Sequence, residues 1–142
     1  MLAAGNALLS AAREVQAYGL AAAHLGLDEP LVIISFSDDT STRDYRVLYN
    51  PEILALSEAA QSGPEGSVSM PGIEVPVKRA IWADVAWSDA SDHRQTLRFQ
   101  GFVARIAQHE IDQVNGIFFL RRVSPLRRST ALRRFQKSHP SL

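Results

Sequence analysis

The sequence contains no cysteine, so a disulfide framework is excluded and no thiolate is available to bind a metal or attack a substrate. It also has no run approaching the roughly 20 apolar residues that span a bilayer. The Ala-rich start, residues 1–12, lacks the basic region of a signal peptide and runs directly into Arg13 and Glu14. We therefore expect a helix at the amino terminus and a cytoplasmic protein.

Acidic residues are missing from the end of the chain. None follows Asp112, whereas seven of the fifteen basic residues lie at or after Arg121. Residues 121–142 therefore carry a net charge of +7 and residues 1–120 carry −7. This basic tail could neutralise the acidic body, dock on nucleic acid or another anionic surface, or form a solvated helix face.

The composition is that of a soluble globular protein, with 46% hydrophobic and 21% charged residues. A chain of 142 residues is long enough to bury a core, so we expect residues 1–142 to form a single domain.

Apolar periodicity and turn residues predict the order of the elements. Helices are expected at 2–17 and 102–115, the second ending before Gly116 as at a C′ glycine, and a short basic helix after 124–125. A loop of fixed shape is expected at 62–72, where three glycines and two prolines occur. Strands are expected at 31–36, 45–49, 53–56, 75–77, 81–87 and 96–99. This order predicts an α+β fold with antiparallel sheets around a buried helix.

The buried helix carries the strongest local signal. Phe102, Ile106, His109 and Gln113 share one face at helical spacing. In the metal-binding pattern H-E-x-x-H, two histidines four residues apart chelate a metal, and the glutamate between them is the general acid/base. Here His109 and Glu110 are followed by Gln113, so half of the chelate is absent. A histidine satisfied by a core hydrogen bond is the alternative interpretation.

Three ordered segments resemble the signature motifs of the peptide deformylase family. The family motif G-x-G-L-A-A-x-Q corresponds to AYGLAAAH at residues 17–24, and E-G-C-x-S-x-P-G corresponds to EGSVSMPG at residues 65–72. The third, Q-H-E-x-D-H, corresponds to QHEIDQ at residues 108–113. The resemblance covers nearly the whole chain and implies the deformylase fold. The family's further amino-terminal segment is not represented, since this chain starts at the first helix.

The resemblance implies a metal-dependent hydrolase that removes the formyl group from an N-terminal formylmethionine. In the family, the motif-two cysteine and both motif-three histidines hold iron, nickel or zinc, and the matching positions are Ser67, His109 and Gln113. A neutral hydroxyl and a carboxamide are poor ligands for such metals. We therefore expect no metal or a weakly bound one, with an activity that is weak, altered or lost.

The remaining family positions imply the other roles. Glu110 matches the general acid/base, Val68 the residue whose backbone N–H holds the formyl oxygen, and His24 the glutamine that bonds the same oxygen. Phe102 and Ile106 match the methionine pocket, or else pack in the core. The motif glycines Gly19 and Gly66 complete the substrate pocket.

Other uses of these side chains stay open. A relocated metal site could use His24 with His109, and Ser67 could bond His109 directly as a Ser–His nucleophile pair. Ser67, His109 and Gln113 could equally form a satisfied polar cluster.

Two functions remain: a deformylase acting on formylated peptides or small acyl-amines, and a non-catalytic peptide or small-ligand binding module that has lost the metal. The family's carboxy-terminal helix contacts the ribosome in bacteria, which suggests the same partner for the basic tail. An unpaired sheet edge would favour a homodimer.

Overall fold

The computed structural model describes residues 2–67 and 69–138, with the side chain of residue 2 excepted. The elements follow one another as α1 (Leu2–Val15), β1 (Gly19–Ala21), the 3-10 helix η1 (Ala22–Leu25), β2 (Leu31–Ser35), β3 (Tyr45–Leu56), β4 (Ala60–Glu65), β5 (Val75–Ala80), β6 (Trp82–Ser88), β7 (Arg94–Gln100), α2 (Gly101–Val114), the 3-10 helix η2 (Phe119–Arg122) and α3 (Pro125–Ser138).

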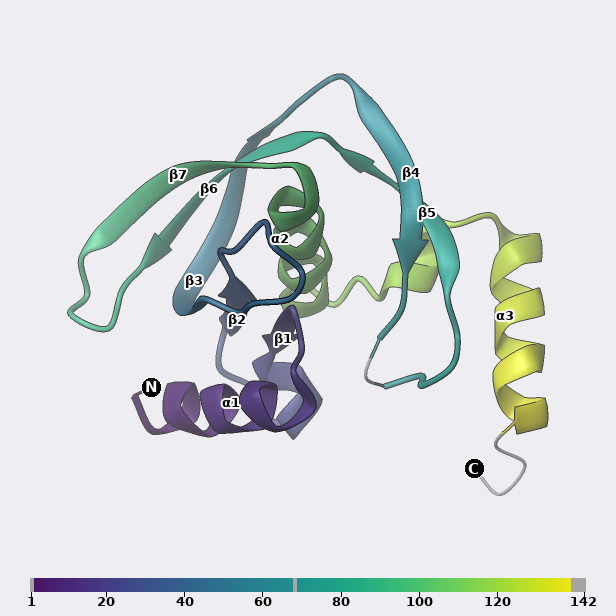
Figure 1. Cartoon of the computed structure of the whole chain (residues 1–142), viewed down its shortest axis with the longest axis horizontal. Helices are drawn as coiled ribbons and strands as arrows, with labels where there is room; N and C mark the ends of the chain where they lie inside the picture. The colour runs from purple at the N-terminus through teal and green to yellow at the C-terminus, as the bar shows by residue number, and fades with distance from the viewer. Residues whose placement is uncertain (1, 68, 139–142) are drawn as a thin grey trace.

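The strands form two antiparallel sheets. Five strands pair in the order β1-β2-β3-β6-β7, and β4 pairs with β5 in a separate two-stranded ribbon. Figure 1 shows α2 at the centre of the fold, with the β4–β5 ribbon descending between α2 and α3. The predicted α+β architecture with antiparallel sheets around a buried helix is confirmed.

Strand β2 is buried along its whole length because helices cover both of its faces. Val32 and Ile34 pack in the core beneath α2, whereas Leu31 and Ile33 pack against α1. A strand covered on both faces has a continuous apolar sequence instead of an alternating one, as this segment does. The two cores therefore meet at β2 and fix the position of α2 relative to α1.

Helix α2 ends as the sequence predicts. The backbone N–H of Asn115 donates to Ile111 O at 3.1 Å, and Gly116 follows with φ of 81°. This left-handed conformation is one that glycine adopts without steric cost. The chain then turns into η2, whose Phe119 and Leu120 are buried with Ala131 of α3.

Two strands differ from the prediction. The strands expected at 45–49 and 53–56 are one strand, β3, which passes through Pro51 with register shifts against β6. The loop expected at 62–72 begins four residues late, because residues 62–65 belong to β4. Proline is tolerated at bulges and in edge strands, where the missing N–H breaks no ladder hydrogen bond. The turn chemistry of these residues was therefore a misleading signal.

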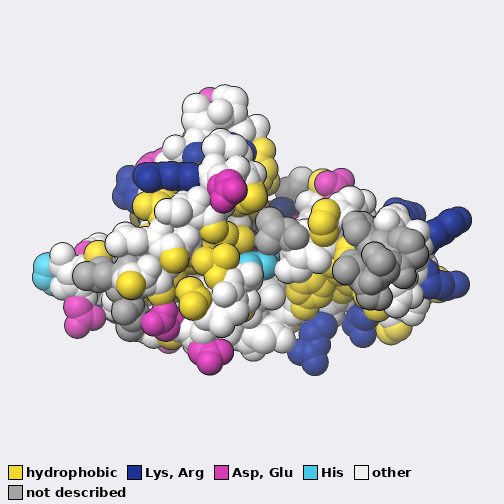
Figure 2. All heavy atoms as spheres, turned by 90° about the horizontal axis from the view of Figure 1, so that it is seen from below, with side chains coloured by type: hydrophobic (Ala, Val, Ile, Leu, Met, Phe, Trp, Pro, Cys, Tyr) yellow, Lys and Arg dark blue, Asp and Glu magenta, His cyan; other side chains and the backbone are white. Residues whose placement is uncertain are grey.

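The basic tail forms α3 as predicted, and its charges face outward. Among the described residues, Arg122 is the one member of this tail in an ion pair with a carboxylate. Figure 2 shows Lys and Arg side chains at the end of the molecule where α3 lies. Neutralisation of the acidic body by contact is thus limited to Arg122. No helix within the described residues is both long and apolar enough to cross a membrane.

Candidate functional site

A cavity of about 510 Å³ opens between β1, α2 and the β4–β5 ribbon. Figure 2 shows a histidine side chain at the centre of the face seen from below, with hydrophobic side chains on both sides. The lining residues are Gln16, Ala17, Tyr18, Gly19, His24, Pro64, Glu65, Gly66, Ser67, Glu74, Phe102, Arg105, Ile106, His109 and Glu110. All three sequence motifs therefore meet at one cavity.

Helix α2 supplies one wall of the cavity. Phe102, Ile106 and His109 lie on the same face at i, i+4 and i+7, and Glu110 adjoins them. The predicted pocket residues Phe102 and Ile106 are brought together with Gly19 and Gly66. Among the described residues of α2, the lining ends at Glu110, so Gln113 lies outside it.

His109 is anchored by Glu65 from strand β4. Its Nδ1 lies 2.9 Å from Glu65 Oε1, and both side chains are buried. Since an ionised carboxylate can only accept, this hydrogen bond places a proton on Nδ1. The other ring nitrogen, Nε2, takes no part in it. Burial alone would lower the pKa of His109, but the Glu65 hydrogen bond and the charges of Glu110 and Glu65 raise it overall.

Glu65 is the centre of a buried ion network. Arg79 donates to both of its oxygens at 2.9 Å, and Arg105 donates to Oε2 at 2.7 Å. Burial opposes ionisation of Glu65, but hydrogen bonds from His109 and Arg79, together with their charges, lower its pKa to about 2. Glu65 is therefore a carboxylate throughout the physiological range and fixes the imidazole ring of His109.

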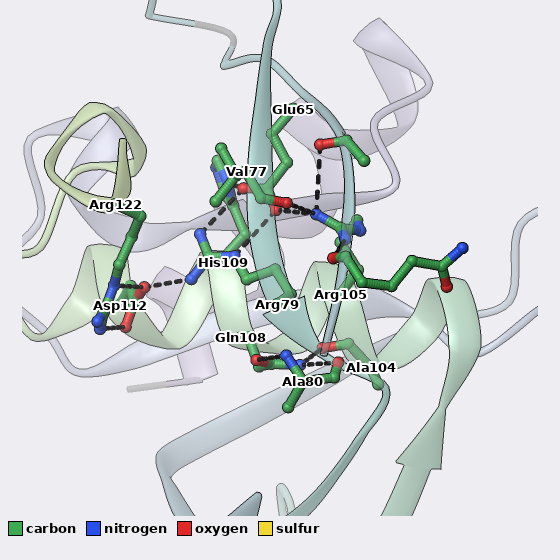
Figure 3. A network of polar contacts seen from close by, with 12 residues as sticks. Glu65, Val77, Arg79, Ala80, Ala104, Arg105, Gln108, His109, Asp112 and Arg122 are labelled. Atoms are coloured by element: carbon green, nitrogen blue, oxygen red, sulfur yellow. Dashed lines mark hydrogen bonds and ion pairs between the residues drawn. The ribbon is translucent and has the colours of Figure 1, made fainter. Parts of the chain in front are cut away.

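The network continues away from the cavity. Arg79 Nη1 donates to Asp112 Oδ2 at 2.5 Å, and Arg122 contacts both oxygens of Asp112 at 2.9 and 2.8 Å. Figure 3 shows this chain of alternating charges running from His109 to Arg122 beside α2. It joins β4, β5, α2 and η2, so the position of His109 depends on all four elements.

Arg105 fastens the β4–β5 ribbon to α2. Its guanidinium donates to the backbone oxygens of Gln61, Gly63 and Val77 as well as to Glu65. A Cβ at Gly63 would lie 3.1 Å from the guanidinium carbon, so glycine permits this close approach. The ribbon carries the second motif, and Arg105 therefore helps to set the depth of the cavity.

Glu110 has the opposite environment from Glu65. Its side chain is buried, and Oε1 receives no hydrogen bond from any described residue. Burial raises its pKa to about 7, against the opposing charges of His109 and Arg79. A Cβ at Gly19 would lie 2.9 Å from Glu110 Cγ, so the motif glycine leaves room for this carboxyl group.

His24 faces the same cavity from η1. Its Nδ1 lies 3.1 Å from both the backbone N and the backbone O of Ala21. Burial lowers the pKa of His24, and the nearby His109 lowers it further. The imidazole is therefore neutral at pH 7. Its Nδ1 either accepts from the Ala21 N–H or donates to Ala21 O, and in the first of these tautomers Nε2–H is a donor.

Ser67 and Gln113 do not form the suggested contacts with His109. Ser67 Oγ accepts from the Ser69 backbone N–H at 3.2 Å, and Gln113 Oε1 is buried without a partner among the described residues. The Ser–His hydrogen bond is not among the contacts within residues 2–67 and 69–138, where His109 Nδ1 bonds to Glu65. The same contacts contradict a satisfied cluster of these three side chains. Val68 lies outside the described residues.

Comparison with known proteins identifies the family. The model of the polypeptide deformylase family matches residues 3–129. A peptide deformylase-like protein of Rhizobium meliloti is 36% identical over 130 residues, which cover 92% of this chain and 74% of that protein. The chain belongs to the polypeptide deformylase family. Peptide deformylase 1 of a Nostoc species is also 36% identical, over 74% of this chain and 56% of that protein.

Solved deformylases have the same fold. The enzyme of Legionella pneumophila superposes with a TM-score of 0.84 at 30% identity, covering 95% of this chain and 78% of that one. The Synechococcus elongatus deformylase in complex with actinonin superposes with a TM-score of 0.80 at 31% identity, covering 89% of this chain and 70% of that one. The fold expected from the three motifs is confirmed.

The residues at the deformylase metal positions do not fit a transition metal. Across the described residues, no group of three or more His, Cys, Asp or Glu side chains is placed to hold an ion. Of the three matching positions, His109 supplies an imidazole, Ser67 a neutral hydroxyl bonded to the Ser69 N–H, and Gln113 an amide outside the cavity lining. Such metals need thiolate or imidazole donors in this kind of site. His24 adds one imidazole to the cavity without completing a set.

The sequence alone did not reveal the ion network. Glu65 begins the second motif, but no role was assigned to it, to Arg79 or to Arg105. A signal was present, because Glu65 lies two residues before the ligand position Ser67, and Arg105 lies four residues before His109 in an otherwise apolar segment. A buried charge needs a partner, and each of these was therefore a candidate for pairing.

Proposed function

We propose that this protein binds the amino-terminal residue of a peptide in its deformylase cavity and has weak or no deformylase turnover. The observation that carries the proposal is a cavity of about 510 Å³ with all three family motifs around it but one imidazole at the metal positions. Ligand cavities commonly have 300–1,000 Å³. The binding space is thus kept while the donors of the metal are replaced.

The position of the strands supports an extended peptide as the ligand. Strand β1 is an edge of the five-stranded sheet, and β4 belongs to a ribbon of two strands. Gly19 of β1 and Pro64 and Glu65 of β4 line the cavity. An extended peptide adds to a strand edge through main-chain hydrogen bonds, with its alternate side chains entering pockets.

An apolar wall suits the first side chain of such a peptide. Phe102 packs edge-on against Tyr18 with ring centroids 4.9 Å apart, and Ile106 follows one turn further along α2. We assign the methionine side chain to this wall, because a flexible thioether packs favourably against aromatic rings. Gly19 and Gly66 would let the peptide backbone approach closely.

The carbonyl oxygen of a blocked amino terminus has two candidate donors. His24 Nε2–H replaces the amide of the family glutamine, and the backbone N–H of Val68 has the family's oxyanion role. Both assignments rest on the family motifs, and His24 is supported by its position in the cavity.

A second candidate is retained hydrolysis of the formyl group. The observation in its favour is Glu110, a buried carboxyl group at the cavity whose pKa is raised to about 7, as suits a general acid/base at neutral pH. Iron, nickel or zinc would then be held weakly through His109.

The two candidates are separated by measuring binding and turnover on one preparation. Formyl-Met-Ala-Ser is titrated calorimetrically, and formate release is followed with and without added nickel. We expect binding with turnover at least about 10²-fold below that of the Ser67→Cys/Gln113→His variant. Filling the cavity with Gly19→Leu should abolish binding. Turnover by the unmodified chain that equals the double variant and is lost in Glu110→Ala would overturn the proposal.

For the basic tail we propose an anionic partner such as ribosomal RNA. Arg121, Arg127, Arg133, Arg134 and Lys137 are exposed on η2 and α3. Binding of an RNA hairpin should weaken as salt increases and should be lost in Arg133→Glu/Arg134→Glu, with Glu58→Gln as the control. Unchanged binding in the charge-reversal variant would contradict this partner. The homodimer and the cytoplasmic location expected from the sequence remain predictions.

A further inference from the structure

We propose that strand β7 pairs with the same strand of a second copy of this chain, antiparallel and with Leu97 on the two-fold axis. The inference concerns the edge of the five-stranded sheet opposite β1 and is independent of the ligand that enters the cavity. It follows from the length of this edge, the direction in which its side chains lean and the residues whose backbone faces outward.

Strand β7 is a long edge. Its seven residues, Arg94–Gln100, pair with β6 on one side, and within the described part of the chain no strand lies on the other side (Figure 1). The opposite edge strand, β1, has three residues. Native proteins protect edges by short length, proline or a bulge. Strand β7 contains no proline, and its register against β6 has no shift. The edge is therefore open to another strand.

The charged side chains of β7 lean back over their own sheet. Arg98 Nε lies 2.7 Å from Asp84 Oδ1, and the guanidinium carbon of Arg98 lies 3.7 Å from the centre of the Trp82 ring. Arg94 donates to Asn50 O at 3.0 Å. These partners belong to β6 and β3. Charged side chains commonly keep a second strand away from an edge. Here both arginines are held over neighbouring strands, so they do not cover the backbone of the edge.

The backbone hydrogen bonds show which residues of β7 face outward. At the two ends of the β6–β7 hairpin, the N–H of Gly101 donates to Ile81 O and the N–H of Asp89 donates to His93 O, each at 3.0 Å. Along an antiparallel ladder, successive residues point their N–H and C=O groups alternately toward the partner strand and away from it. The odd-numbered residues of β7 therefore bond to β6, and the even-numbered ones present their backbone groups at the open edge.

Charge selects one register for the second copy. Since outward-facing residues must meet each other, the registers with the greatest overlap have the two-fold axis at Thr96, Leu97 or Arg98. An axis at Thr96 places Arg94 opposite Arg98 of the second copy, and an axis at Arg98 places the two copies of Arg98 opposite each other. Like charges directly opposite are destabilising. An axis at Leu97 places Arg98 opposite Thr96 and Arg94 opposite Gln100, so no arginine faces another.

The same register continues an apolar row across the sheet. Ile53 of β3 lies opposite Val85 of β6, which lies opposite Leu97 of β7. Val85 is fully buried, whereas Leu97 is 44% exposed. With the axis at Leu97, this residue is in a non-hydrogen-bonded pair, in which opposite side chains approach closely. The second copy therefore covers an apolar side chain that a single chain leaves exposed to solvent.

The oligomeric state is measured by sedimentation velocity at constant salt. A single strand pair is a small interface, so we expect a dimer with a dissociation constant on the order of micromolar, seen between about 1 and 200 µM chain. Leu97→Lys places two lysines opposite each other on the axis and should weaken the dimer at least about tenfold. Leu54→Lys changes an exposed leucine of the central strand β3 and should leave the dimer within about twofold.

A single introduced thiol reports the register, because the chain has no cysteine. Leu97→Cys places two thiols in a non-hydrogen-bonded pair with Cα atoms about 4.5 Å apart, within the reach of a disulfide. Gln95→Cys, the matched control on the same face of β7, separates the two Cα atoms by at least about 13 Å. Under mild oxidation, we expect a covalent dimer from Leu97→Cys and none from Gln95→Cys.

Three results contradict this inference. A monomer at every concentration overturns it and leaves the edge to a strand of another protein. A dimer that Leu97→Lys does not weaken overturns it, since the contact then lies elsewhere on the surface. Cross-linking through Gln95→Cys in preference to Leu97→Cys also overturns it, because the two strands then meet in a different register.

Discussion

Two glutamates lie next to His109, and their pKa values are shifted in opposite directions. Burial opposes ionisation of Glu65, but the hydrogen bonds and charges of His109 and Arg79 lower its pKa to about 2. Glu110 is buried without such donors, and burial raises its pKa to about 7. Environment, not residue type, thus makes one a fixed structural carboxylate and the other a group available to a ligand or a proton.

Replacing Glu65 should both destabilise the protein and change its response to acid. Glu65→Gln leaves Arg79 and Arg105 as buried cations with a weaker partner, so the free energy of unfolding at pH 7 should fall by roughly 3 kcal/mol. The folded-state pKa is depressed below the ordinary 4.5, so its stabilisation is present above pH 4.5 and is lost as pH falls toward 2. Urea unfolding measured between pH 4.5 and 2 should show that the free energy of unfolding falls less with acid in the variant than in the unmodified protein. An unchanged profile would contradict the network.

Replacing Glu110 should raise the free energy of unfolding at high pH, whereas replacing Glu65 lowers it. Its folded-state pKa is raised from 4.5 to about 7, so the buried carboxyl is tolerated below pH 4.5 and destabilises the fold increasingly as pH rises to 7. Glu110→Gln should therefore raise the free energy of unfolding at pH 8 by about 1–3 kcal/mol and change it little at pH 4. Urea unfolding checks this, with Glu58→Gln as the control. Destabilisation at pH 8 would show that the carboxylate is paired.

Gly19 has no space for a side chain beside the cavity. A Cβ there would lie 2.6 Å from Ile106 Cγ2 and 2.9 Å from Glu110 Cγ. Gly19→Ala should therefore lower the free energy of unfolding by about 1–3 kcal/mol. Ile106→Ala removes the nearer atom, so the double variant should be less destabilised than the sum of the two single ones, as thermal or urea unfolding can measure. Strict additivity would contradict the packing.

At the scale of elements, periodicity predicted the helices better than the strands. The spacing of Phe102, Ile106 and His109 at i, i+4 and i+7 is a local property, and α2 begins and ends one residue before the predicted helix at 102–115. Strand β4 was missed because Gly63 and Pro64 are turn residues in isolation. They are tolerated there since Arg105 needs the space at Gly63 and the ribbon pairs β4 with β5 alone.

The site was predictable to the extent that its residues lie in the motifs. His24, Ser67 and Glu110 were found in this way and meet at the cavity. The pairing of Glu65 with Arg79 and of Arg79 with Asp112 spans 14 and 33 residues of sequence. Such pairing follows from tertiary structure, so one sequence without its fold does not specify it. For the same reason, the sequence did not reveal that His109 bonds to Glu65 instead of Ser67.

Helix α3 is attached to the body through a small contact. Ala131 is buried against the cluster that contains Phe119, and Arg128 donates to Leu120 O at 2.9 Å. Ala131→Glu places a charge in this contact and should free α3, with faster amide hydrogen exchange across residues 125–138. Thr130→Glu adds the same charge at the neighbouring exposed position and should leave the exchange unchanged. Equal exchange in both variants would contradict this attachment.

At the scale of the whole molecule, a deformylase fold surrounds a cavity where the three family motifs meet. The fold agrees with solved deformylases, whereas the metal positions present Ser67, His109 and Gln113. An ion network of buried side chains fixes His109. Its far end reaches Arg122 in the basic tail, so the cavity and the charged surface belong to one connected structure.

The most direct test of this account is the nickel stoichiometry of the purified chain, measured by elemental analysis after loading and gel filtration. We predict well below one nickel per chain, and about one per chain in Ser67→Cys/Gln113→His, whose thiolate and second imidazole complete the donor set. One tightly held nickel per unmodified chain, lost in His109→Ala, would contradict the account.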